Sequence, residues 1–119
     1  MCRTLPSQAD REGHAASLAK AGNLVVVLKG TATVVTDGTR VYVNTTGNPG
    51  MAKGGSGDVL TGVIAALIAQ HLPPFEAAQL GVYAHGLAGD MARDQSGEVG
   101  MIAGDIVDAL ADAFAHLSE

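Results

Sequence analysis

Apolar residues in the first third of the chain predict a helix followed by a strand. Ser7 is placed to cap a helix that runs to about Lys20, with Gly22 just past its end. Five consecutive apolar residues, Leu24–Leu28, come next and show no polar alternation. This pattern is typical of a strand that is covered on both faces, as in a parallel sheet. We therefore expect half of an α/β unit in this region.

A hairpin is predicted directly after that strand. The β-branched runs Thr33–Thr36 and Arg40–Val43 flank an Asp37-Gly38 pair. Asp-Gly between two such runs is a strong signal for a tight turn.

Helical patterns fill the second half of the chain. They predict helices over about Gly57–Gln70, Pro74–Arg93 and Asp105–His116, with Gly104 as a cap of the last one. The run from Val59 to Ala69 is so apolar that we expect a buried helix, and it is too short for a membrane span. A strand covered on both faces needs neighbours, so we expect either the C-terminal part of a larger α/β domain or a partner chain that completes the sheet.

Composition narrows the function class. The chain has 119 residues, a net charge of −5, a single cysteine and 3% aromatic residues. This length fits one domain, and the negative charge argues against general nucleic-acid binding. The lone Cys2 excludes a disulfide framework within the chain, so a cytoplasmic setting is expected. The N-terminal residues lack the apolar core of a signal peptide, and no membrane association is expected.

Between the hairpin and the first of these helices lies a glycine-rich stretch, GNPGMAKGGSGD, which ends at Asp58. It fits neither the Walker A pattern, nor the dinucleotide fingerprint, nor the nucleophile elbow. The first amides of a helix have no partner within the helix and favour an anion, which glycines allow to approach closely. We therefore predict an anion hole formed by the amides of Gly54, Gly55, Ser56 and Gly57.

Asp58 has two interpretations at this stage. A carboxylate in this position can cap the helix, as Asp often does. It can also accept the proton of a hydroxyl that attacks a bound phosphate. The residues alone leave both interpretations open.

Three segments resemble a known family. They read VVLKGTATVV, YVNTTGNPGMAKGGSGDVLTGVIAALIAQ and PFEAAQLGVYAHGLAGDMA, and they cover most of 24–110. They are similar to the ADP-dependent NAD(P)H-hydrate dehydratases of the ribokinase-like superfamily. The resemblance implies a three-layer α/β/α fold, of which this chain would be an incomplete, C-terminal part of a single domain over 1–119. The family's N-terminal half, with further substrate contacts, has no counterpart here, and an epimerase domain can be fused upstream.

The resemblance also implies an activity and its residues. Family members repair hydrated NADH and NADPH with ADP (or ATP) and Mg²⁺: the substrate hydroxyl is phosphorylated and phosphate is then eliminated, giving AMP and phosphate. The nucleotide-binding segment corresponds to Lys29, Gly30, Thr31, Ala32 and Thr33, and Gly57 corresponds to a nucleotide contact. Asp58 corresponds to the residue that contacts the substrate and serves as the base. The glycine-loop amides would hold the transferred phosphoryl group.

Other polar residues have simpler interpretations. We expect His85 to be a hydrogen-bonded core histidine, and the small residues around it to allow close helix packing. Asp90 and Asp94 are expected to be solvated, and Lys53 is given no required role. No spacing of His, Cys, Asp and Glu indicates a metal site, so Mg²⁺ would arrive with the nucleotide phosphates.

Two other functions are compatible with the sequence. One is a ribokinase-like kinase of small molecules, against which the GNPGMA segment argues. The other is a non-catalytic nucleotide-binding fragment, because a chain of this length is expected to lack part of the pocket. A homo-oligomer is possible.

Overall fold

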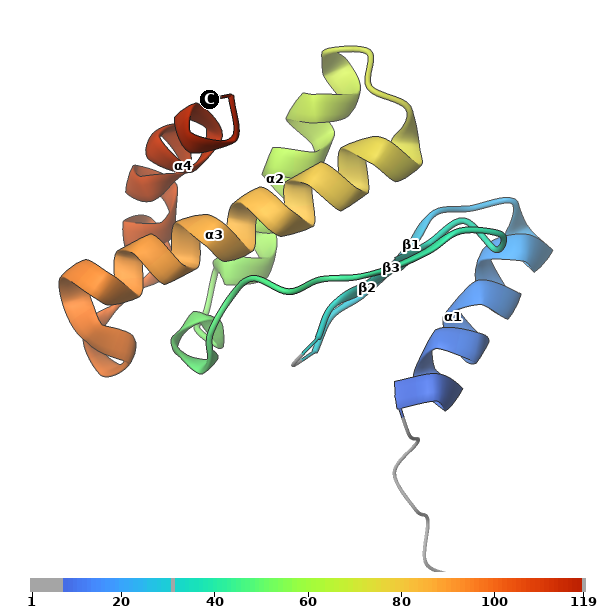
Figure 1. The fold of residues 1–119 in the computed structure, drawn as a ribbon, viewed down its shortest axis with the longest axis horizontal. Coiled ribbons are helices and arrows are strands. Elements are labelled where there is room, and N and C mark those ends of the chain that lie inside the picture. Colours follow the sequence, from blue (N-terminus) through green and yellow to red (C-terminus); the bar gives the residue numbers. More distant parts are fainter. Residues whose placement is uncertain (1–7, 31, 119) are drawn as a thin grey trace, which may run out of the picture. The chain divides into compact units, whose positions relative to one another are not determined.

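The computed structural model describes residues 8–30 and 32–118, with side chains from residue 10 onward. These residues form two compact units that meet in sequence at Val43 and Asn44 (Figure 1). The predicted cap Ser7 lies outside the described residues.

The first unit is a helix packed on a small sheet. Helix α1 (Gln8–Gly22) precedes strands β1 (Val26–Leu28), β2 (Val34–Thr36) and β3 (Val41–Val43). The strands pair in the order β1-β2-β3, antiparallel throughout, with Val27 opposite Val35 and Val35 opposite Tyr42. The central strand β2 is fully buried, and α1 contributes Ala15 and Ala19 to the same core.

Two details of this unit differ from the sequence predictions. We expected β1 to be a buried strand of parallel type, but it is half-buried and pairs antiparallel with β2. The prediction failed because a run of apolar residues indicates the character of the side chains but not whether the strand pairs parallel or antiparallel. The left-handed residue that ends α1 is Asn23 (φ 53°) and not Gly22. The Leu24 amide donates to the Ala19 carbonyl and the Asn23 amide to the Lys20 carbonyl, which together form a Schellman motif.

The predicted hairpin is confirmed, and Asp37 organises its turn. The Asp37 Oδ1 atom accepts hydrogen bonds from the amides of Arg40 (2.7 Å) and Thr39 (3.0 Å). The Arg40 Nε atom also donates to Oδ2 at 2.9 Å, and Gly38 takes the positive φ of 97° that the turn requires. The amide bonds from Arg40 and Thr39, followed by the bond and charge of the Arg40 side chain, lower the pKa of Asp37 to about 2.

Asp37 gives this hairpin a defined acid sensitivity. Its pKa is lower in the folded protein than the value of about 3.9 expected in an unfolded chain. The carboxylate therefore stabilises the fold above about pH 4, and this contribution is lost as the pH falls toward about 2. We expect an NMR titration of the Asp37 carboxyl carbon to give a midpoint near 2. A midpoint at the ordinary value of Asp would contradict the turn geometry.

The second unit is helical. It contains a short 3₁₀ helix, η1 (Pro49–Met51), followed by α2 (Ser56–Ala69), α3 (Pro74–Gly100) and α4 (Ala103–Leu117). The predicted starts of α2 and α3 agree with the structure to within one residue. Helix α3 extends seven residues beyond the predicted end at Arg93, although Gly97 (φ 74°, ψ 159°) interrupts its helical geometry. Gly104 is not the cap of α4: Ile102 is, and its amide donates to Asp105 Oδ2 at 2.8 Å.

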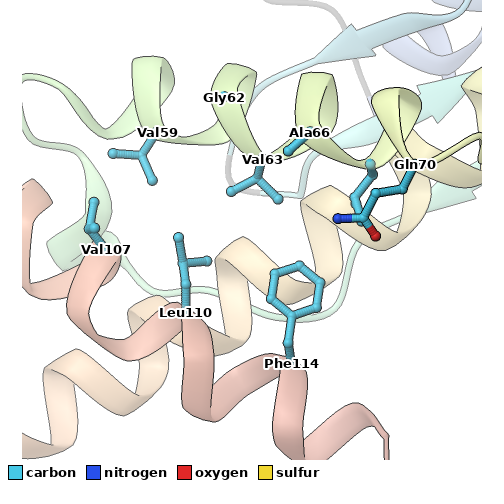
Figure 2. Close-up of a pocket in the computed structure, with 9 residues that line it drawn as sticks. Val59, Gly62, Val63, Ala66, Gln70, Val107, Leu110 and Phe114 are labelled. Atoms are coloured by element: carbon cyan, nitrogen blue, oxygen red, sulfur yellow. The ribbon is translucent and has the colours of Figure 1, made fainter.

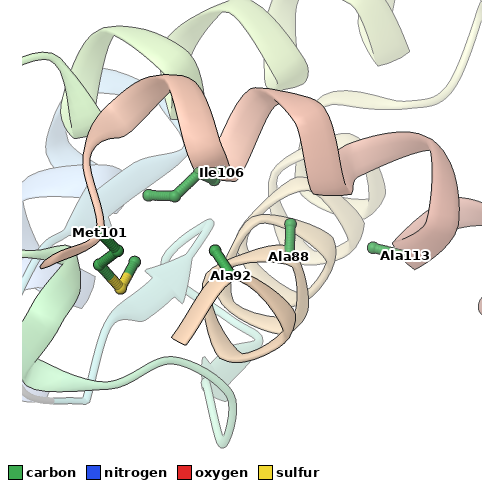
Figure 3. Packing of buried hydrophobic residues seen from close by; sticks show 5 residues of the cluster. All are labelled: Ala88, Ala92, Met101, Ile106 and Ala113. Atoms are coloured by element: carbon green, nitrogen blue, oxygen red, sulfur yellow. The ribbon is translucent and has the colours of Figure 1, made fainter. Parts of the chain in front are cut away.

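The core of this unit lies between α3 and α4 (Figure 3). Ala88 and Ala92 of α3 pack with Ile106 and Ala113 of α4, and Met101 from the connection fills the space beside them. All five side chains are almost completely buried. Alanines on α3 allow the two helix axes to approach, and the larger side chains of Met101 and Ile106 restore the packing density.

Three glycines on α3 accommodate neighbouring segments. A methyl group at Gly81 would meet Ile64 of α2, one at Gly86 would meet Thr46, and one at Gly89 would meet Met51 of η1. The sequence had suggested close packing between helices here. The structure confirms that for Ala88, which packs against α4, whereas at Gly86 and Gly89 the neighbour is segment 44–51.

Substitution of Gly86 tests this close approach. A methyl group there would lie 2.8 Å from the backbone carbonyl carbon of Thr46, which cannot move away like a side-chain tip. We expect G86A to destabilise the protein by about 1–3 kcal/mol. G62A is the matched control on α2, where a methyl group has no neighbour within 4 Å, and it should stabilise by about 0.5–1 kcal/mol. Urea unfolding measures both; equal effects would refute the contact.

None of the helices among the described residues is both long and apolar enough to cross a membrane.

Candidate anion-binding site

The glycine-rich stretch leads directly into α2. Its N-cap is Gly55, in a left-handed conformation with φ 90° and ψ −15°, and no side chain caps the helix. The Lys53 amide donates to the Met51 carbonyl, and the Ser56 amide donates to the Lys53 carbonyl at 3.3 Å. A residue with a Cβ atom is strained at such a positive φ. Glycine at position 55 is therefore part of how the loop turns into the helix.

Several amides at this helix start remain available. Among the described residues, the amides of Gly54, Gly55, Gly57 and Asp58 have no hydrogen-bond acceptor. The Ser56 amide is the exception in the predicted set, since it is engaged by Lys53. Gly54 and Gly55 are exposed, and neither has a side chain of its own to shield its backbone. Unpartnered amides combined with the helix dipole suit a negatively charged group such as a phosphate.

Asp58 is the third residue of α2, and its side chain is exposed. Its carboxylate forms no hydrogen bond or ion pair with any described residue. The interpretation of Asp58 as the side-chain cap of the helix is therefore wrong, because Gly55 occupies the N-cap position. The carboxylate is left free beside the unpartnered amides.

Ser56 and His85 connect the start of α2 to α3. Both side chains are buried, and Ser56 Oγ lies 3.5 Å from His85 Nε2 in a long hydrogen bond. This confirms the expectation that His85 is a hydrogen-bonded core histidine. The contact also holds the first residue of α2 in place, since Ser56 is N1 of the helix.

Asp90 anchors the other end of the loop. It accepts hydrogen bonds from the Gly47 amide at 3.1 Å and from Asn48 Nδ2 at 2.8 Å. Our expectation that Asp90 is merely solvated was therefore wrong, whereas Asp94 is indeed exposed, with 73% of its side chain accessible. Spacing could not reveal the anchor, because its partners lie 42 and 43 residues away.

The charged side chains around this site bear on whether it would bind an anion or a metal ion. Lys53 Nζ is exposed and lies 3.4 Å from the Val99 carbonyl, which leaves its charge accessible. In the described part of the chain, no group of three or more His, Cys, Asp or Glu side chains could hold a metal ion. The loop thus suits an anion, and a divalent cation would need ligands from that anion.

The segment predicted to bind a nucleotide lies in the first unit. It follows β1, and its residues Lys29 and Gly30 are exposed while Ala32 and Thr33 are half-buried; Thr31 lies outside the described residues. Arg11 of α1 donates from Nη2 to the Lys29 carbonyl at 3.3 Å. Sequence reasoning missed this contact, since nothing in the helical pattern distinguishes Arg11 from its neighbours.

A family model described as NAD(P)H-hydrate dehydratase matches residues 1–112. The chain belongs to this family. Over 114 residues it is 52% identical to the bifunctional NAD(P)H-hydrate repair enzyme Nnr of Moorella thermoacetica, covering 94% of this chain and 21% of that protein. It is 44% identical to the ADP-dependent (S)-NAD(P)H-hydrate dehydratase of Neisseria meningitidis, covering 86% of this chain and 35% of that protein. The chain therefore spans well under half of these relatives.

Solved structures agree with the family and the fold. The ADP/ATP-dependent NAD(P)H-hydrate dehydratase of Bacillus subtilis, co-crystallised with ATP/Mg²⁺, superposes with a TM-score of 0.85 at 33% identity, covering 92% of this chain and 40% of that one. A hydroxyethylthiazole kinase from Pyrococcus horikoshii gives 0.80 at 20% identity, which shows the fold alone. The predicted fold class, a partial ribokinase-like α/β fold, is confirmed.

An apolar groove separates the inward faces of α2 and α4 (Figure 2). Its volume is about 630 Å³, and Val59 and Val63 of α2 face Leu110 and Phe114 of α4. The prediction of a buried helix is wrong for most of α2. Only Ser56, Leu60 and Leu67 of this helix are buried. Gln70 is the one polar side chain in the groove, so the groove lacks the converging polar groups of a catalytic site.

Neighbouring glycines in the loop should respond differently to alanine. Gly55 has φ 90°, and an added methyl group would lie 3.3 Å from Ala103 Cβ. We expect G55A to destabilise the second unit by about 1–2 kcal/mol. G54A is the control, since a methyl group at Gly54 has no neighbour within 4 Å. Thermal unfolding compares the two variants, and equal melting temperatures would contradict the turn.

Proposed function

We propose that this chain supplies the phosphoryl-binding loop and the proton acceptor of an ADP-dependent NAD(P)H-hydrate dehydratase, a lyase that repairs hydrated NADH and NADPH. The observation that carries the proposal is the start of α2. The unpartnered amides of Gly54, Gly55 and Gly57 lie beside the free carboxylate of Asp58. An anion hole and a base are the two elements that phosphoryl transfer to a hydroxyl requires.

Each residue has a distinct task in the proposed reaction. Asp58 takes the proton of the substrate hydroxyl while the hydroxyl oxygen forms its bond to phosphorus. The amides of Gly54, Gly55 and Gly57 stabilise the negative charge on the phosphoryl oxygens. ADP, or ATP, would supply the phosphoryl group and leave as AMP or ADP, with Mg²⁺ entering on its phosphates. Elimination of phosphate and a proton from the substrate then gives NAD(P)H, and Lys29–Thr33 would hold the nucleotide.

The relatives support this assignment by their names. The Neisseria protein is named ADP-dependent, and the Bacillus enzyme was crystallised with ATP/Mg²⁺. Because this chain spans less than half of each, the rest of the pocket would come from polypeptide that corresponds to the remainder of a single ribokinase-like domain. We place the reaction in the cytoplasm. A small-molecule kinase is less favoured, because the likeness to the thiazole kinase shows the fold alone.

Nucleotide binding tests the loop directly. In the wild-type chain, titration with Mg²⁺ and ADP should shift the amide resonances of Gly54, Gly55 and Gly57 and raise the melting temperature by mass action. D58N should bind ADP at least as well, because it removes a negative charge next to the phosphates. Unchanged glycine resonances at millimolar ADP would overturn the proposal.

Conversion of NADH hydrate tests Asp58. Where the chain converts the hydrate with ADP, D58N should lower kcat by about 10²–10⁴-fold, the typical contribution of a general base. The exposed Asp94 provides the matched control, and D94N should leave kcat unchanged. Full activity in D58N would exclude the role of base. A wild-type chain that binds ADP but converts no hydrate would make it a nucleotide-binding fragment.

A further inference from the structure

The segment that precedes the anion loop runs along one face of α3. Asn44 donates to the Val82 carbonyl and Thr46 to the Tyr83 carbonyl. Further along, the Gly47 amide donates to Asp90. The segment therefore follows α3 in the same direction as the helix, and its last contact before η1 is with Asp90.

Asp90 carries the charged contact in this series. Its two carboxylate oxygens are used separately: Oδ2 accepts from the Gly47 amide, and Oδ1 accepts from Asn48 Nδ2. Arg93 Nη1 lies 3.9 Å from Oδ1. Hydrogen bonds to an ionised acceptor are stronger than neutral ones, particularly where water is partly excluded; only 25% of the Asp90 side chain is accessible.

A series of hydrogen bonds continues from Asn48 to the anion loop. Asn48 Oδ1 accepts the Gly50 amide and so caps η1. The Met51 carbonyl accepts the Lys53 amide at 2.8 Å, and the Lys53 carbonyl accepts the Ser56 amide. The Asn48 carbonyl also accepts the Met51 amide at 3.1 Å, so backbone bonds link Asn48 to Met51, Met51 to Lys53 and Lys53 to Ser56. A shift of Asn48 would therefore be passed on to Gly54 and Gly55.

We propose that Asp90 is a positioning residue: by fixing Gly47 and Asn48 on α3, it sets the placement of the amides in Gly54–Asp58. This inference deepens the proposed function. Its nucleotide-binding measurement rests on that function, whereas the measurement of loop order does not. A carboxylate is suited to this task because it accepts from two donors at once. An asparagine at position 90 would turn its amide group toward one of two donors, leaving that donor without an acceptor.

The pair Asn48 and Asp90 allows a reciprocal test. In D90N, two amide side chains face each other, and one of the two donors to position 90 loses its acceptor. In N48D, two carboxylate oxygens would lie 2.8 Å apart in the present geometry and repel each other. The double variant N48D/D90N restores every bond: Asn at 90 accepts from Gly47 and donates to Asp at 48, which still accepts the Gly50 amide. D94N is the matched control, because Asp94 lies one turn further along α3 and is exposed.

Two measurements on the full 119-residue chain read the result. The ¹⁵N heteronuclear NOE of Gly54–Asp58 measures loop order without any ligand. Both single variants should lower it, while the double variant and D94N keep the wild-type values. The Kd for Mg²⁺ and ADP should rise on the order of tenfold in D90N, the loss expected when a charged hydrogen bond is broken, and should return in N48D/D90N.

The outcomes separate this inference from its alternatives. Wild-type NOE values for Gly54–Asp58 in a folded D90N overturn it, as does a double variant that stays disordered. A role in overall stability alone would lower the melting temperature of D90N without a selective loss of order at Gly54–Asp58, and it would also refute the proposal. If the wild-type chain fails to bind ADP, the proposed function fails, while the NOE comparison still decides the role of Asp90.

Discussion

The second unit depends on a close approach between the backbone of segment 44–51 and α3. This approach is possible because Gly86 and Gly89 present no side chains where Thr46 and Met51 lie. It brings Asn44 and Thr46 within hydrogen-bond distance of α3 carbonyls, and Gly47 and Asn48 within reach of Asp90. The irregular chain is thus hydrogen-bonded to α3 at four of its residues. The proposed anion loop follows this segment directly in the chain.

A glycine-rich loop does not keep a fixed backbone conformation by itself, because glycine loses the most conformational freedom on folding. The structure compensates by fixing the loop from both sides. Asp90 holds Gly47 and Asn48, His85 holds Ser56, and both side chains come from α3. Between these anchors, Gly50 is buried against the backbone of Glu98 near the end of the same helix. One rigid element therefore orders a segment whose own residues favour disorder.

The sequence predicted local features well and distant ones poorly. The Asp37-Gly38 turn, the start of α2 and Pro74 at the start of α3 follow from conformational preferences of a few adjacent residues, and the structure has them. The direction of β1 depends on which strand pairs with it, and Asp90 depends on partners over 40 residues away. A single sequence holds no signal for such pairings. The length of α3 was underestimated because its last residues are polar, and polar residues continue a helix as readily as they end one.

The identity of the helix cap decides how Asp58 can be understood. A side-chain cap of α2 would place an oxygen on the free amides of the first turn and so occupy the place of an anion. Gly55 turns the chain into the helix without any side chain, since it adopts φ 90°. Both the amides and the carboxylate of Asp58 consequently remain available, a few atoms apart along the backbone. Asp58 then stabilises the helix start only through the favourable helix dipole. A free carboxylate next to unpartnered amides is the arrangement that the proposed proton removal during phosphoryl transfer requires.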